Sequence, residues 1–202
     1  GLVGYARYRT DFSSSYNTGA VSAGDDYAGG LIGFADRFAD IISSYNTGSV
    51  LAGADYAGGL VGYADSDTDF NYSYNTGSVS AVGHDAGGLV GYAADDTIAN
   101  YSYNTGWVSG VDEIGGLVGY ADYDTDFNYS YNIGQVSGDD YVGGLVGYVN
   151  DYGNITSSFN TGLVSGGGGD GDSVGGLIGR GRGNILASFN SGAVSGDDDI
   201  GG

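Results

Sequence analysis

The sequence of 202 residues contains no Cys, no Pro and no Met, and all five of its basic residues are Arg. Without Cys, the chain has neither a disulfide framework nor a thiolate metal site. The basic residues face 25 Asp and Glu, so the formal net charge is −20 and the phosphates of a nucleic acid would be repelled. No apolar run approaches the roughly 18 residues of a membrane-spanning helix, so no membrane span is expected. An initiating Met and a signal peptide are also missing, which indicates a processed chain or a fragment.

Glycine and hydrophobic residues are abundant instead. The chain has 43 Gly and 19 Tyr, and hydrophobic residues make up 41% of it. A disordered acidic chain would lack these aliphatic and aromatic side chains. A collagen would need Gly at every third position together with abundant Pro. The composition therefore indicates a folded chain of another kind.

The glycines belong to a repeat. The segment Gly-Leu-Val/Ile-Gly recurs in steps of 28 or 29 residues, with a last step of 32. Such self-similarity predicts a single repeat array over residues 1–202, either a window of a longer chain or a filament subunit. The expected coils start near Gly1, Gly30, Gly59, Gly88, Gly116, Gly144 and Gly176.

A second signature, Ser-Tyr/Phe-Asn-x-Gly-x-Val, runs in step with the first and spans Ser15 to Val21 in its first copy. Helical periodicity is absent, whereas apolar and polar residues alternate before it. This alternation places Phe12 and Tyr16 on one face of a strand and Asn17 on the other. The Asn of each copy is expected to form a hydrogen-bonded ladder at a corner of the coil.

Three short strands per repeat, joined by Gly and Asp turns, predict an all-β fold. The fold class expected is a parallel β-solenoid (β-helix) of about seven coils of 28–29 residues, with one repeat per coil. Propeller blades need about 40 residues or more, so this repeat is too short for them. Identical residues of successive coils would then stack about 4.8 Å apart.

The repeats resemble the GLUG repeat, whose core is Gly-Leu-hydrophobic-Gly. The matching segments include 30–33 (Gly-Leu-Ile-Gly) and 59–62 (Gly-Leu-Val-Gly), with the downstream Tyr-Asn-x-Gly-x-Val, and they cover essentially the whole chain. The resemblance implies a large secreted or cell-surface protein of bacteria or archaea, adhesins included, and supplies no catalytic residues. The last copy departs from the pattern, because Arg-Gly-Arg-Gly at 180–183 replaces the usual Tyr-Ala-Asp stretch.

Acidic residues gather in two sets, one after the first strand of each repeat and one before the Gly-Gly. Asp-x-Asp-x-Asp resembles the opening of several calcium loops, since hard cations prefer carboxylate oxygens. The alternative is a solvated acidic surface that keeps the rod soluble and attracts cations without specific sites. The candidate calcium ligands are Asp65, Asp67, Asp69, Asp122, Asp124 and Asp126.

Four Asn residues stand in glycosylation sequons. Three of these sequons share one position of the repeat, where the alternation predicts an outward side chain. The alternative is that these Asn residues are simply polar strand residues. The candidate acceptors are Asn71, Asn100, Asn128 and Asn154.

Catalysis finds little support in the sequence. His84 is the only His, it lies in an expected turn, and the chain has neither Cys nor Lys as nucleophile or base. No enzyme is therefore expected. The leading hypothesis is an extracellular structural protein: a β-solenoid shaft of a surface filament, fibre or adhesin stalk that associates with itself and binds cations along its acidic edges. The alternative is an adhesion module in which Tyr and Asp ladders bind carbohydrate or a surface.

Overall fold

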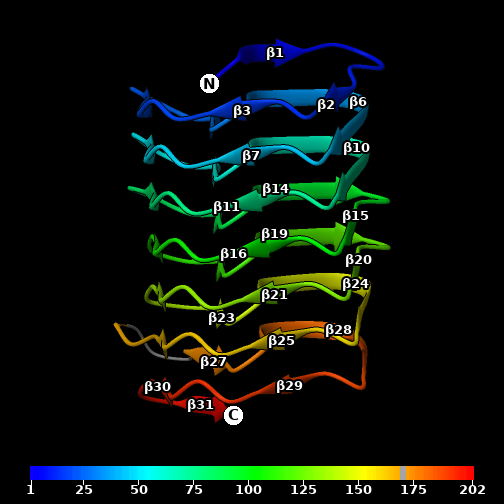
Figure 1. Ribbon diagram of the computed structural model, residues 1–202. Coiled ribbons are helices and arrows are strands. Elements are labelled where there is room, and N and C mark those ends of the chain that lie inside the picture. Colours follow the sequence, from blue (N-terminus) through cyan, green and yellow to red (C-terminus); the bar gives the residue numbers. More distant parts are fainter. Residues whose placement is uncertain (169–171) are drawn as a thin grey trace.

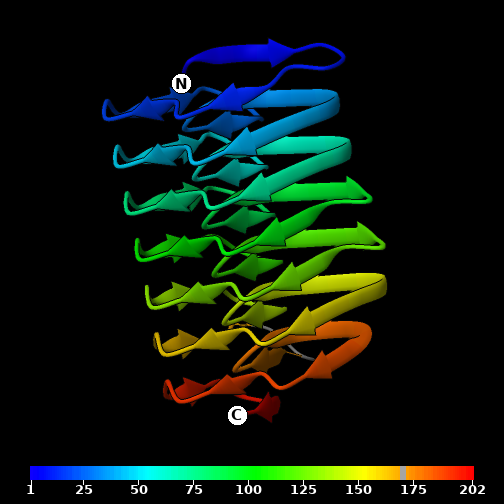
Figure 2. The same cartoon turned by 45° about the vertical axis from the view of Figure 1, so that its right-hand side comes forward.

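The computed structural model describes residues 1–168 and 172–202, and all regular structure in this part of the chain is β. The chain winds into stacked coils whose strands pair in parallel with the coils above and below (Figure 1). Turning the molecule shows the two termini at opposite ends of the stack (Figure 2). The predicted parallel β-solenoid of about seven coils is confirmed. Among the described residues, no helix has the length and apolar character to cross a membrane.

Each coil contributes to four sheets, which are called A to D here in the order in which the chain visits them. Sheet A contains the long strands: β1 (Val3–Ala6), β2 (Phe12–Ser13), β6 (Ile32–Ile42), β10 (Val61–Asn71), β14 (Val90–Asp95), β15 (Ile98–Asn100), β19 (Val118–Tyr123), β20 (Asp126–Asn128), β24 (Val146–Thr156) and β28 (Ile178–Leu186). Sheet B contains β3 (Tyr16–Asn17), β7 (Tyr45–Asn46), β11 (Tyr74–Asn75), β16 (Tyr103–Asn104), β21 (Tyr131–Asn132), β25 (Phe159–Asn160) and β29 (Phe189–Asn190).

The other two sheets are also built from short strands. Sheet C contains β4 (Val21–Ala23), β8 (Val50–Ala52), β12 (Val79–Ala81), β17 (Val108–Ser109), β22 (Val136–Ser137), β26 (Val164–Ser165) and β30 (Val194–Ser195). Sheet D contains β5 (Ala28–Gly29), β9 (Ala57–Gly58), β13 (Ala86–Gly87), β18 (Ile114–Gly115), β23 (Val142–Gly143), β27 (Ser173–Gly175) and β31 (Asp199–Gly201). Each coil thus has three short strands, as in the sequence prediction, and in addition the longer run of sheet A.

Equivalent residues of successive coils lie in register. Val61 pairs with Val90, and Tyr63 pairs with Tyr92, one repeat further along the chain. In sheet A, the register shifts between Val149 and Gly153, where β24 meets β28. This is where the last repeat carries Arg-Gly-Arg-Gly, so the sequence departure coincides with a local change in shape.

The corner between sheets A and B corrects the predicted alternation. The residue at this corner has a positive φ in every coil, for example 49° at Ser14 and 55° at Tyr72. The expected continuous strand is therefore broken, and the pattern of inward and outward side chains shifts. Phe70 is buried, but Tyr74 points outward, so the prediction that the apolar residue and the Tyr share a face is wrong. The residues at the corner are Ser14, Ser43, Tyr72, Tyr101, Tyr129, Ser157 and Ala187.

Ladders of buried polar side chains provide hydrogen bonds to the backbone at this corner. Ser73 is fully buried; its Oγ donates to the carbonyl oxygen of Ile41 at 2.9 Å and accepts from the N–H of Ser44 at 3.1 Å. The Asn46 side chain donates to Asn75 Oδ1 at 2.8 Å, and the same bond repeats along the stack. The predicted Asn ladder is thus confirmed, and it lies inside the coil.

The two sequence signatures supply residues to two apolar clusters inside the coils. Leu60 and Val61 of the first signature are fully buried, next to Phe70 of sheet A, while Val79 of sheet C belongs to a second apolar cluster. A Cβ on Gly59 would collide with the Asn75 side chain and with the backbone of the next coil. The Gly that precedes each core Leu is therefore required by its close approach to the Asn ladder.

Candidate functional site on the acidic rows

The first acidic triplet lies on β10 at the outer end of sheet A. Asp67 has a positive φ of 49°, so the strand bends in the middle of Asp-x-Asp-x-Asp. Asp67 and Asp69 line a groove of about 580 Å³ together with Asp40 and Asp96 of the neighbouring coils. Burial, with Asp40 and Asp67 next to it, raises the pKa of Asp69. Asp65 lies outside this groove, so the bend separates the first carboxylate from the other two.

The second triplet, Asp122, Asp124 and Asp126, lies two coils further along the stack, and its carboxylates contact different partners. Asp122 accepts from the Tyr92 hydroxyl at 3.3 Å and from the side chain of Asn150 at 2.7 Å. Asp126 accepts from the side chain of Asn154 at 2.7 Å, and Asp124 occupies the bend, with a φ of 44°. Within the described residues, neither triplet forms a compact group of three metal-ligating side chains.

Three of the sequon Asn residues form an outward ladder on sheet A. Asn100 donates to Asn71 at 3.0 Å, and Asn128 donates to Asn100 at 3.1 Å. All three side chains are half-buried, and their outward position agrees with the sequence. Asn154 lies in a different row, between Asp126 and Asn184. Glycosylation of these residues remains a prediction.

Aromatic rings stack on one another along the outer surface. The rings of Tyr63 and Tyr92 are 4.7 Å apart and within 1° of parallel, and those of Tyr74 and Tyr103 are 4.8 Å apart with the same 1° angle. A third row, which begins with Tyr72, is arranged in the same way. Because each ring covers the face of the next, these rows present ring edges and hydroxyl groups to solvent.

A further aromatic row is interrupted by carboxylates. Tyr27 and Tyr56 stack 5.2 Å apart and set their edges against the Tyr63 row. In the register of sheet D, the next two coils have Asp85 and Glu113 at this position. Tyr141 then restores the aromatic residue and contacts Tyr148. Two carboxyl groups thus lie in a row whose neighbouring positions are Tyr.

The residues just before this row are acidic in all coils except one. The backbone N–H of Asp55 donates to Asp26 Oδ1 at 3.2 Å, and that of His84 donates to Asp55 Oδ1 at 2.8 Å. The row continues in the register of sheet D, and we call it the His84 row. Its members are Asp26, Asp55, His84, Asp112, Asp140, Asp172 and Asp198.

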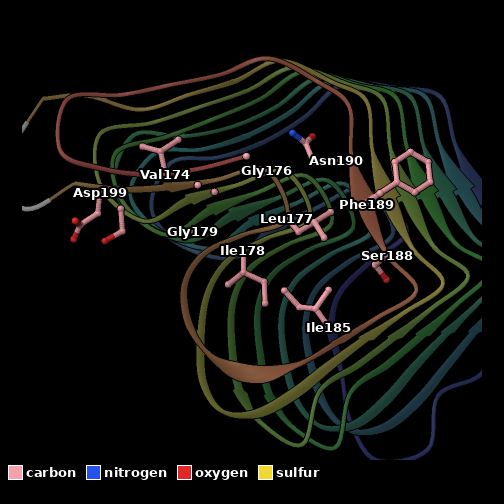
Figure 3. Close-up of a pocket in the computed structure, with 14 residues that line it drawn as sticks. Val174, Gly176, Leu177, Ile178, Gly179, Ile185, Ser188, Phe189, Asn190 and Asp199 are labelled. Atoms are coloured by element: carbon pink, nitrogen blue, oxygen red, sulfur yellow. The ribbon is translucent and has the colours of Figure 1, made fainter.

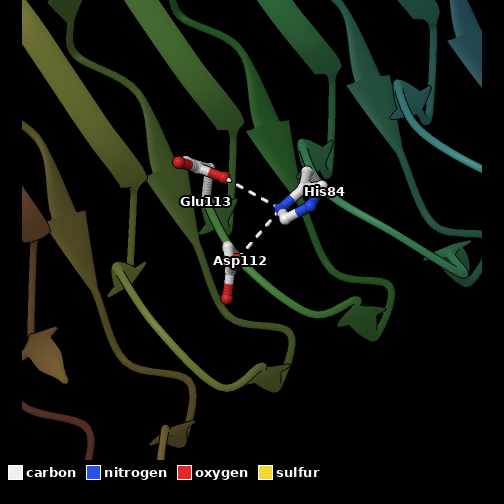
Figure 4. Close-up of side chains that lie close together, drawn as sticks. All are labelled: His84, Asp112 and Glu113. Atoms are coloured by element: carbon white, nitrogen blue, oxygen red, sulfur yellow. Dashed lines mark ion pairs between the residues drawn. The ribbon is translucent and has the colours of Figure 1, made fainter. Parts of the chain in front are cut away.

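His84 meets two acids of the next coil (Figure 4). Its Nδ1 is 3.0 Å from Asp112 Oδ2 and 3.5 Å from Glu113 Oε2. The His84 side chain is 50% exposed, whereas those of the two acids are 24% and 21% exposed. Burial raises the pKa of Glu113, and His84 opposes that rise. Among the described residues, this is the one group of three potential metal ligands whose donor atoms lie within 4.8 Å of one another.

Asp85, next to His84 in the chain, is a buried acid. It is only 7% exposed, and its Oδ1 has no hydrogen-bond partner. Its backbone N–H donates to the Asp112 carbonyl oxygen at 3.1 Å, which fixes it above the two acids of the next coil. Burial, followed by the charges of Glu113 and Asp55, raises the pKa of Asp85 to about 8.

Sequence reasoning did not find this cluster. In sequence, His84 is an isolated turn residue, because it has no copy in another repeat. The signal was present in the period, since a step of 28 residues takes residue 84 to Asp112, beside the only Glu of the chain. Stacking therefore assembled a site that no local motif shows.

Comparison with known proteins adds no relative: no family model, no curated protein and no solved structure matches the chain. The resemblance to the GLUG repeat rests on the repeated residues alone. The function is therefore inferred from the solenoid and its surfaces.

Proposed function

We propose that the protein is structural: an extracellular β-solenoid shaft of a surface filament, fibre or adhesin stalk, without catalytic activity. The observation that carries this proposal is that the parallel backbone pairing, the buried Asn ladder and the aromatic row of sheet B run from coil to coil through the stack. A rod of this kind transmits load along its axis through many equivalent hydrogen bonds. Its likeness to GLUG repeats supports the cell-surface location.

The two ends of the stack support association between coils. At the C-terminal end, a groove of about 550 Å³ is lined by Leu177, Ile178, Ile185 and Phe189 (Figure 3). Ile185 is 52% exposed, whereas its equivalent one coil earlier, Ile155, is 1% exposed. At the N-terminal end, the first core Leu, at position 2, is exposed in the same way. These surfaces fit a further coil of the same repeat, either from this chain or from a second copy.

The acidic edges set the solution behaviour of the shaft in this proposal. Rows of carboxylates a coil apart repel one another and attract cations from the medium. The best candidate for the proposed calcium binding is the groove around Asp67 and Asp69, which Asp40 and Asp96 from adjacent coils also line, together with Arg9. An extracellular fibre would find millimolar-range divalent cations in many environments, and calcium is the ion that such oxygen ligands favour.

The stacking of the aromatic rows favours a structural shaft over a carbohydrate-binding module. Sugar binding by aromatic residues uses ring faces, and the stacking of Tyr74 on Tyr103 and its equivalents covers those faces. Surface binding through exposed ring edges, such as that of Tyr72, remains the alternative proposal.

End-to-end association can be tested with a pair of matched variants. Ile185→Asp places a charge on the exposed end of the core, whereas Leu163→Asp places the same charge on the side of the shaft, where Leu163 is 41% exposed. We expect the wild type and Leu163→Asp to form rods longer than one chain in negative-stain images, and sedimentation to show the same species. Ile185→Asp should remain as single short rods with an unchanged β-type circular dichroism spectrum. Compact single particles of the wild type at all concentrations would refute self-association, and calcium-dependent binding to glycans would favour the alternative.

A further inference from the structure

The His84 cluster stands outside the repeat in its chemistry. Every other member of its row is Asp, and the cluster joins the only His of the chain to its only Glu. His84 and Asp85 belong to one coil, whereas Asp112 and Glu113 belong to the next. The other six coils fold with an Asp at this position, so the repeat itself does not require the imidazole of His84.

The geometry suits a metal ion that takes both nitrogen and oxygen ligands. Ligand atoms around a tetrahedral zinc ion with bonds of about 2.0–2.1 Å lie about 3.3–3.4 Å apart. The two separations from His84 Nδ1, 3.0 Å to Asp112 Oδ2 and 3.5 Å to Glu113 Oε2, lie on either side of that value. Imidazole nitrogen is a ligand for zinc and its neighbours in the first transition row, whereas calcium and magnesium take oxygen ligands.

Asp85 gives an independent reason to expect a cation. Its carboxyl group is more than nine-tenths buried, and Oδ1 has no hydrogen-bond partner. Its backbone N–H donates to the Asp112 carbonyl oxygen at 3.1 Å, which ties it to the coil that carries Asp112 and Glu113. The ion pair of Arg37 is with Asp65, away from this cluster. Two carboxyl groups thus contact one imidazole, and the buried Asp85 lies beside them, so a divalent ion would offset the excess of negative charge.

We propose that His84, Asp112 and Glu113 bind a divalent transition-metal ion of the zinc type, with Asp85 as the adjoining buried carboxylate. The ion would join the third coil to the fourth and act as a clip across the stack. The half-exposed imidazole gives the ion a path from solvent. This site is separate from the acidic groove around Asp67 and does not depend on the proposed role as a shaft.

The unique His makes the test direct. Zinc chloride is titrated into the full chain in excess magnesium, which occupies the diffuse acidic surface, and the imidazole resonances of His84 are followed by NMR. We expect one equivalent of zinc to shift these resonances to saturation and to raise the melting temperature. Calcium at the same concentration should do neither. Unchanged His84 resonances in the presence of zinc would overturn the proposal, whatever the variants do.

Two variants separate the site from general acidity. His84→Asn should weaken the binding of the first zinc ion by at least about tenfold and abolish the thermal shift. Asp26→Asn, which changes an acid at the equivalent position two coils away, should bind zinc as the wild type does. Circular dichroism confirms that both variants fold. Equal zinc affinity in the wild type and His84→Asn, or several equivalents bound with the same strength, would show that only the acidic surface binds the metal.

Discussion

The second and third coils pair an Asn with an Asn inside the stack and an Asp with an Asp at its edge, and the two pairs differ in burial and in hydrogen bonding. Asn46 and Asn75 are in register and buried, and each side chain both donates and accepts. Asp40 and Asp69 are also in register, on the outer side of sheet A, and burial and repulsion raise the pKa of Asp69. An amide carries a donor and an acceptor, so copies of it satisfy one another, whereas ionised carboxylates only accept. A repeat can therefore bury Asn in every coil, whereas an Asp that it buries, such as Asp85, carries a raised pKa.

The largest effect is expected where an Asp replaces an Asn of the buried ladder. In Asn104→Asp, the side chain loses its donation to Asn132 at 2.9 Å and to the Gly106 carbonyl oxygen at 2.8 Å, and two oxygens face each other instead. An uncompensated buried charge of this kind should lower the free energy of unfolding by about 3–5 kcal/mol at pH 7. Denaturant unfolding followed by circular dichroism measures the change.

The matched control is Asn190→Asp in the last coil. Asn190 is only part-buried and accepts one bond from Asn160. Its replacement should cost clearly less than Asn104→Asp, and lowering the pH should restore stability to both variants. Equal losses at the two positions would show that burial does not separate the amide ladder from the acidic edges.

An intermediate loss in the free energy of unfolding is expected when Gly88, which lies against the same Asn ladder, is replaced by Ala. A Cβ at Gly88 would overlap the Asn104 side chain and the Gly116 carbonyl oxygen, so Gly88→Ala must displace the ladder or the next coil. Overpacking of this kind costs about 1–3 kcal/mol. Gly24→Ala is the control, because its Cβ would meet nothing within 4 Å, and it should leave the unfolding midpoint nearly unchanged. A Gly88→Ala protein as stable as the control would mean that the ladder yields easily.

The repeat explains why the solenoid could be predicted and why parts of its surface could not. A fixed period places equivalent residues in one row, so the coil number and the ladder of Asn75 followed from spacing alone. The positive φ at Tyr72 could not be foreseen, because non-Gly residues other than Asn and Asp rarely adopt it, and it reverses which side chains face inward. The bend at Asp67 likewise divides a triplet that appears continuous in sequence. The contact of His84 with Asp112 joins residues 28 positions apart, and no local motif predicts it, because His occurs at this position of the repeat in one copy alone.

The smallest change in the free energy of unfolding is expected for Asp69→Asn at the acidic edge. This substitution should raise the stability, whereas those above lower it. The folded pKa of Asp69 is raised above the unfolded value of about 3.9, so the folded chain holds more protons just above that pH. Stability should therefore fall as the pH rises from about 4 through the folded pKa, and Asp69→Asn should remove this part of the loss. Because like charges in directly opposed positions cost less than 1 kcal/mol, we expect Asp69→Asn to gain about 0.5 kcal/mol at pH 7 and nothing at pH 3. Thermal unfolding of both proteins across this range measures the difference, and added salt should shrink it. A loss of stability in Asp69→Asn at pH 7 would show that the carboxylate is held by a favourable partner, in which case the edge would resemble the amide ladder more than its charge suggests.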